Sequence, residues 1–100
     1  MIALSNSTTP RPEPLIPEAA RNVFARLPTV RAMRGGVSTS ALYDDMKRGL
    51  FPRPITLSRR MVVWPLDEVE RINAALIAGA DDEAIRALVK ELVEARKDRA

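Results

Sequence analysis

The chain has 100 residues and a formal net charge of +3, and it contains neither cysteine nor histidine. This length fits one small domain with a tail and is too short for two independent hydrophobic cores. Disulfides, thiolate or imidazole metal sites, and catalysis by a Cys or His nucleophile are therefore excluded. Because the chain has no long apolar run and its first residues lack a signal-peptide pattern, we expect a cytoplasmic protein with no membrane partner and no cofactor.

The charge is distributed unevenly along the chain. Residues 1–22 are neutral overall, whereas residues 23–64 carry eight Arg or Lys against two Asp, a net charge of +6. Residues 65–100 carry six basic and nine acidic side chains, a net charge of −3. This asymmetry indicates a polyanion bound at one face and a different role for the C-terminal part.

The first segment is rich in proline, with four prolines between positions 10 and 17. Proline fixes φ and has no backbone donor, so we expect residues 1–22 to form a disordered arm, with a short helix possible over 17–21. Residues 23–27 form a candidate short strand, able to pair with a later hairpin.

Two short helices and a glycine turn follow. Residues 27–34 are predicted to be helical, with Pro28 in the first turn, and Gly35-Gly36 ends this helix. Ser38 is a suitable N-cap for a second helix that runs to Arg48. Two short helices joined by such a turn make a helix-turn-helix motif, although an ordinary helical hairpin has the same spacing.

The second helix has two different faces. Leu42 and Met46 share one side, which we predict to be buried. The opposite side carries Thr39, Ser40, Tyr43 and Lys47, with Asp44 at its edge. Asp44 weighs against DNA binding, because a carboxylate repels phosphate and accepts hydrogen bonds only from donors such as cytosine N4. Asp45 lies nearer the inner side, and we expect it to pair with a neighbouring arginine.

A basic hairpin follows directly. Residues 51–63 contain two β-prone runs around a polar turn, with Arg59 and Arg60 near the tip and Trp64 after the second run. A hairpin behind a helix-turn-helix makes the winged version, which presents a helix to the major groove and a cationic loop to the neighbouring backbone. The alternative is a hairpin tip that is simply solvated.

Two further helices are predicted at the C-terminal end. The first begins at Pro65, ends at Gly79 and has an apolar stripe of Leu66, Val69, Ile72 and Leu76. The second is capped by Asp81 and has an apolar stripe of Ile85, Leu88, Val89, Leu92 and Val93. Acidic residues 81–83 fit a helix N-terminus better than a metal site. The stripe of the last helix packs either on the chain's own core or on a dimer or partner surface.

The connected pattern Ser38-x-Ser40-x-Leu42-Tyr43-x-x-Met46-x-x-Gly49-x-Phe51-Pro52-x-Pro54 resembles the AlpA family of prophage regulatory proteins, small relatives of excisionase and MerR-like winged helices. The resemblance covers residues 26–72. It implies a DNA-binding regulator of prophage or integrative-element genes. Some members of the family act as excisionases, which bend DNA to direct a tyrosine recombinase towards excision. At Thr39 and Asp44 the chain departs from the basic residues that are frequent in the family.

We therefore predict a mainly α-helical winged helix-turn-helix with a small β-hairpin wing and C-terminal helices. The predicted segments are an arm (1–22), a DNA-binding domain (23–78) and a C-terminal helical extension (79–100). The residues predicted to contact DNA are Arg31, Arg34, Ser38, Thr39, Ser40, Tyr43, Asp44, Lys47, Arg53, Arg59 and Arg60. Catalytic and metal-binding residues are not predicted.

Three functions fit this sequence. The first is a sequence-specific regulator of a prophage or mobile element, bound to double-stranded DNA as a homodimer or a cooperative array, because so small a module makes few contacts. The second is an excisionase that acts with a tyrosine recombinase and bends DNA. The third is a protein–protein adaptor that uses the acidic C-terminal helices.

Overall fold

The computed structural model describes residues 22–99, so the predicted arm and the predicted helix over 17–21 lie outside the described residues, apart from Asn22. In chain order the elements are β1 (Phe24–Arg26), α2 (Leu27–Met33), α3 (Thr39–Lys47), β2 (Ile55–Ser58), β3 (Met61–Pro65), α4 (Leu66–Ile77), α5 (Asp82–Ala95) and the 3-10 helix η2 (Arg96–Arg99). The described part is mainly helical with a small three-stranded sheet, which confirms the predicted fold class.

The helix-turn-helix forms where the local signals predicted it. Gly35 and Gly36 both have φ near +82°, a conformation that suits glycine and lets the chain reverse after α2. The Ser38 Oγ accepts a hydrogen bond from the Ala41 amide at 3.0 Å and so caps α3. Gly49, with φ +76°, ends the turn after α3, and the Leu50 amide donates to the Asp45 carbonyl.

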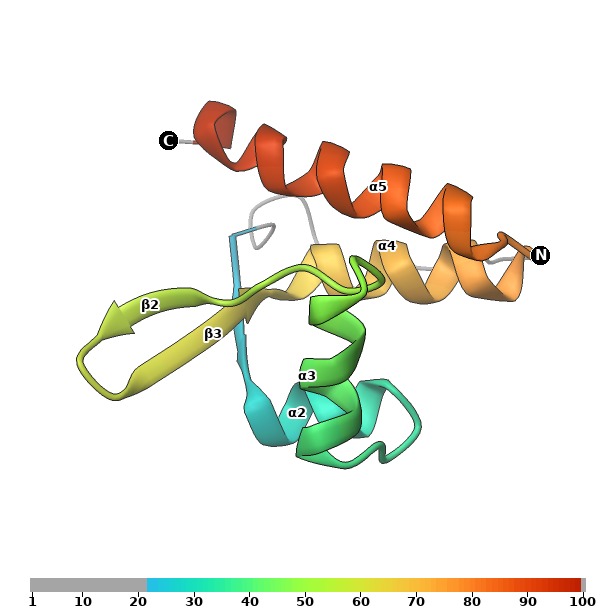
Figure 1. Ribbon diagram of the computed structural model, residues 1–100. Coiled ribbons are helices and arrows are strands. Elements are labelled where there is room, and N and C mark those ends of the chain that lie inside the picture. Colours follow the sequence, from blue (N-terminus) through green and yellow to red (C-terminus); the bar gives the residue numbers. More distant parts are fainter. Residues whose placement is uncertain (1–21, 100) are drawn as a thin grey trace, which may run out of the picture.

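The three strands form one antiparallel sheet in the order β1-β3-β2. The candidate strand at residues 23–27 is confirmed, because β1 pairs with β3 and places Ala25 opposite Trp64. Both of these residues are buried, so this face of the sheet contributes to the core. The β2–β3 hairpin projects away from the helices as a wing (Figure 1).

Within the described residues, a single hydrophobic core joins β1, β3, the helices α2 to α5 and Phe51. Its buried members are Ala25, Val30, Leu42, Met46, Phe51, Trp64, Val69, Ile72, Ile85, Val89 and Leu92. In α4, Leu76 is 44% exposed, so the predicted stripe leaves the core in the last turn of that helix.

The apolar stripe of α5 packs on this core. Ile85, Val89 and Leu92 are all less than a tenth exposed, and α5 lies alongside α4 (Figure 1). These three members of the stripe therefore pack on the chain's own core, whereas Val93, at its edge, is 37% exposed.

Candidate nucleic-acid interface

The outer face of α3 is open to solvent. Leu42 and Met46 point into the core, with 0% and 4% of their surface exposed, and so fix the orientation of the helix. The opposite side presents Thr39, Ser40, Tyr43, Asp44 and Lys47, all exposed. The two-faced helix predicted from the sequence is therefore present, with hydroxyl groups, an ammonium group and one carboxylate on its free side.

The two neighbouring aspartates of α3 have different surroundings. Asp45 faces Arg34 at 3.5 Å and Arg48 at 3.9 Å, which confirms the expected pairing with a neighbouring arginine. Asp44 is exposed, and within residues 22–99 no ion pair to it is found. One of the two carboxylates is thus neutralised inside the fold, and the other remains on the outer face of α3.

The wing carries its arginines at the end farthest from the helices. Arg59 and Arg60 form the turn between β2 and β3, and both are exposed (Figure 1). Neither takes part in an ion pair with any residue in the described part of the chain. Arg53 is also exposed, on the segment that enters β2. Three guanidinium groups on or beside the wing are therefore available to an anionic ligand.

Two arginines predicted to contact DNA have partners within the fold. The Arg31 Nε donates to the Val37 carbonyl at 2.8 Å and so braces the turn before α3. Arg34 is only 12% exposed; it donates to the Asn73 Oδ1 at 3.3 Å and lies over the Phe51 ring at 4.9 Å. We assign structural roles to both and leave them out of the proposed contact surface.

Ser38, another predicted DNA contact, has a structural role as well, because its hydroxyl group caps α3. Conversely, Arg48 was not among the predicted contacts, although its side chain is 53% exposed next to Lys47. The spacing in the sequence could have identified Arg48 as a contact. It follows Asp44 by four residues, and residues at that spacing share a face of a helix, here the outer face. We add Arg48 to the candidate interface.

Two other kinds of feature, a metal-binding cluster and a membrane-spanning helix, are absent from the described residues. Among residues 22–99 there is no cluster of three His, Cys, Asp or Glu side chains that could hold a metal ion. Within the same range, no helix is both long enough and apolar enough to cross a membrane. The candidate interface consists of the outer face of α3, Arg48 at the end of that helix, and Arg53, Arg59 and Arg60 of the wing.

Comparison with known proteins agrees with this geometry. A family model described as "Prophage CP4-57 regulatory protein (AlpA)" matches residues 23–72, from β1 into α4. The "Uncharacterized protein ORF88" of Enterobacteria phage P4 is 34% identical over 82 residues, a match that covers 79% of this chain and 92% of the phage protein. No solved structure matches. The chain therefore belongs to the AlpA family of prophage regulatory proteins.

Proposed function

We propose that this protein is a sequence-specific DNA-binding regulator of prophage or integrative-element genes. The observation that carries the proposal is the pairing of the exposed polar face of α3 with a wing whose tip holds Arg59 and Arg60. In winged helix-turn-helix proteins these two parts enter the major groove and follow the neighbouring backbone, respectively. Membership of a prophage regulatory family supports the same function.

In this proposal α3 contacts the edges of the bases. The hydroxyl groups of Thr39, Ser40 and Tyr43 can donate or accept hydrogen bonds, and Lys47 can donate to guanine O6 and N7. Asp44 can accept a hydrogen bond from cytosine N4 and disfavours other bases at its position. A short helix that presents one carboxylate, one ammonium group and neutral hydroxyl groups therefore favours selectivity over strong general affinity.

The wing supplies binding that is independent of base sequence. Arg53, Arg59 and Arg60 would hold phosphates beside the groove occupied by α3, and Arg48 would add a contact at the end of that helix. Each arginine that neutralises a phosphate releases counterions, so binding should weaken steeply as the salt concentration rises.

One copy of this surface covers a short stretch of DNA. We therefore propose binding by several copies, as a dimer or on adjacent sites. An excisionase would use the same contacts but would bend the DNA and occupy several sites near an attachment site, where a tyrosine recombinase acts. The small surface of α3 and the wing supports this second function as well, because it requires several copies on the DNA.

The test is fluorescence anisotropy with the full chain at several salt concentrations. DNA from upstream of the protein's own gene is compared with unrelated duplex. Arg59→Ala combined with Arg60→Ala removes the tip charges. Lys90→Ala serves as the control, because it removes an exposed charge from α5, which lies on the other side of the body from the turn between α2 and α3 (Figure 1).

We expect preference for the upstream DNA, a steep salt dependence, weaker binding of the wing variant to both duplexes, and wild-type behaviour of Lys90→Ala. Equal and weak binding to both duplexes would contradict the proposal. It would favour a protein–protein adaptor that uses the acidic C-terminal helices. If specific binding is found, a gel-based bending assay separates the two DNA functions. A bend with cooperative occupancy of several sites indicates an excisionase, and a straight single operator indicates a regulator.

A further inference from the structure

A buried ion pair joins the C-terminal end of the chain to the start of α4. Glu68 is 0% exposed and lies in the first turn of α4. Arg96 of η2 donates to both of its carboxylate oxygens, from Nε to Oε2 at 2.9 Å and from Nη2 to Oε1 at 2.7 Å. This two-pronged geometry holds the guanidinium group in one plane and one position.

The same guanidinium group also reaches the base of the wing. The Arg96 Nη2 donates to the Arg53 carbonyl at 2.9 Å, and the preceding carbonyl, that of Pro52, accepts from the Trp64 indole at 2.8 Å. This segment enters β2, and its prolines at 52 and 54 have no amide hydrogen to donate. The carbonyl groups of Pro52 and Arg53 are the backbone groups that join this segment to Trp64 and to Arg96.

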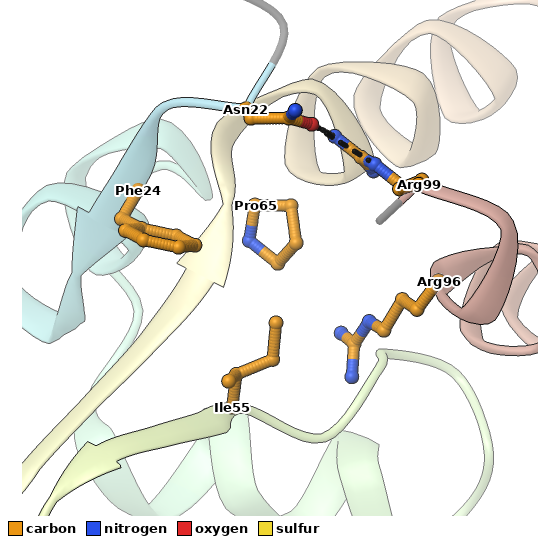
Figure 2. A pocket seen from close by; sticks show the side chains of 6 residues that line it. All are labelled: Asn22, Phe24, Ile55, Pro65, Arg96 and Arg99. Atoms are coloured by element: carbon orange, nitrogen blue, oxygen red, sulfur yellow. Dashed lines mark hydrogen bonds between the residues drawn. The ribbon is translucent and has the colours of Figure 1, made fainter.

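Side-chain packing holds the start of this segment, because Phe51 and Pro52 are buried, but it does not continue across to η2. A pocket of about 300 Å³ separates η2 from the sheet, with Phe24, Ile55 and Pro65 on one side and Arg96 and Arg99 on the other (Figure 2). Arg99 strengthens the position of η2, since it pairs with Asp67 at 3.0 Å and donates to Asn22. Polar links across the pocket thus connect the C-terminal end with the wing base.

We infer that Arg96 is a positioning residue for DNA binding, which fixes the angle of the wing relative to α3 by holding the Arg53 carbonyl while it is anchored on Glu68. This inference rests on the proposed function and goes beyond it. Arg96 and η2 lie outside residues 23–72, the segment that matches the family. In this inference the position of the wing depends on a residue outside the segment that matches the family model.

The physical consequence concerns the alignment of the wing arginines. Arg59 and Arg60 stand at the far end of the hairpin, so a small rotation at its base displaces them by a larger distance. With Arg96 in place, α3 and the wing tip approach DNA as one rigid surface. Without the bond to the Arg53 carbonyl, the tip would have to be ordered again each time the protein binds, and some phosphate contacts would be lost.

The first test variant is Arg96→Lys in the full chain. Lysine keeps a positive charge next to Glu68, but a single ammonium group cannot reproduce the planar fork that serves two carboxylate oxygens and a carbonyl. The control is Arg71→Lys, the same exchange at an exposed position of α4. Anisotropy is measured at several salt concentrations, at a temperature where circular dichroism shows each variant to be folded.

We expect Arg96→Lys to make the plot of log affinity against log salt shallower, by about 0.9 for each phosphate contact that is lost. We expect Arg71→Lys to match the wild type. A protein that is merely less stable keeps the wild-type slope once it is folded, so the slope separates positioning from stability. If Arg96→Lys does not fold, Glu68→Met with Arg96→Met replaces the buried pair by apolar side chains and still removes the bond to Arg53.

A double-mutant cycle completes the test. When Arg59→Ala and Arg60→Ala have already removed the tip contacts, adding Arg96→Lys should change affinity much less than it does in the wild type. If the wild type binds DNA normally, two results would overturn the inference about Arg96 but not the proposed function. One is a fully additive loss of affinity in the double-mutant cycle, and the other is an unchanged salt slope in a folded Arg96 variant. A wild type without salt-dependent DNA binding would overturn the proposed function itself.

Discussion

Replacement of Arg34 by alanine tests whether this arginine contacts DNA, as the sequence suggests, or stabilises the fold, as the structure indicates. From the sequence, Arg34 is a candidate phosphate contact at the end of the first helix. In the structure its side chain is 12% exposed and contacts Asn73, Asp45 and the Phe51 ring. The structure therefore predicts a loss of stability without a loss of phosphate contacts.

The size of this loss follows from the three contacts of Arg34. A hydrogen bond from a charged donor contributes about 1.5–3 kcal/mol, a cation–π contact about 0.5–1 kcal/mol, and a partly exposed ion pair about 0.2–1 kcal/mol. The Arg34 Nε is buried without a hydrogen-bond partner among the described residues, which lowers the net gain. We expect Arg34→Ala to lower the free energy of unfolding by about 2–3 kcal/mol, or the unfolding temperature by roughly 10–20 °C.

Thermal unfolding followed by circular dichroism measures the loss of stability. Anisotropy at several salt concentrations shows whether phosphate contacts are kept. The matched control is Arg48→Ala, because Arg48 shares the partner Asp45 but is 53% exposed. We expect Arg48→Ala to unfold near the wild-type temperature and to make the salt slope shallower by about 0.9. A stable Arg34→Ala protein with a reduced salt slope would refute this reasoning and restore Arg34 to the DNA contacts.

Three other variants separate the parts of the interface. Arg59→Ala with Arg60→Ala should reduce the salt slope by about 1.8 and leave the unfolding temperature unchanged; an unchanged slope would remove the wing tip from the contacts. Tyr43→Ala should reduce the ratio of affinities for cognate and unrelated DNA more than it reduces affinity for unrelated DNA, and anisotropy with both duplexes would show an equal loss if this is wrong. Asp44→Asn should strengthen binding to unrelated DNA, because it removes a charge that repels phosphate; weaker binding would show that the carboxylate itself accepts a base contact.

Local signals were sufficient to predict the α-helices and the strands among the described residues, but not the 3-10 helix η2. Ser38 and Asp81 cap α3 and α5, as expected, because a cap acts on amide groups only a few residues away. Gly35 and Gly49 adopt positive φ at the predicted ends of helices for the same reason. The hairpin also followed from residue patterns close to its turn, whereas the pairing of β1 with β3 joins strands far apart in the sequence.

Apart from the pairing of Asp45 with a neighbouring arginine, the partners of charged side chains could not be predicted in this way. Arg34 meets Asn73, 39 residues further along the chain, and Arg96 meets Glu68 across 28 residues. A carboxylate in the first turn of a helix is favourable whether it is exposed or buried, so nothing near Glu68 in the sequence shows that it needs a cation. The surface against which the apolar stripe of α5 packs could not be predicted either, because its periodicity fits a core and a dimer surface equally well.

The most direct test of the central claim is to map where α3 and the wing lie on DNA. The chain has no cysteine, so a single introduced cysteine can carry a DNA-cleaving reagent at one known position. The three probes are Ser40→Cys on α3, Ser58→Cys beside the wing tip and Ala87→Cys on α5, all at exposed positions.

We predict cleavage inside the bound site from Ser40→Cys, cleavage of the flanking backbone from Ser58→Cys, and little cleavage from Ala87→Cys. Each labelled protein is first shown by anisotropy to bind the upstream DNA, so that absent cleavage reports position rather than lost binding. Strong cleavage from the α5 probe, with little from the α3 and wing probes, would show that a different face meets DNA and would contradict the account.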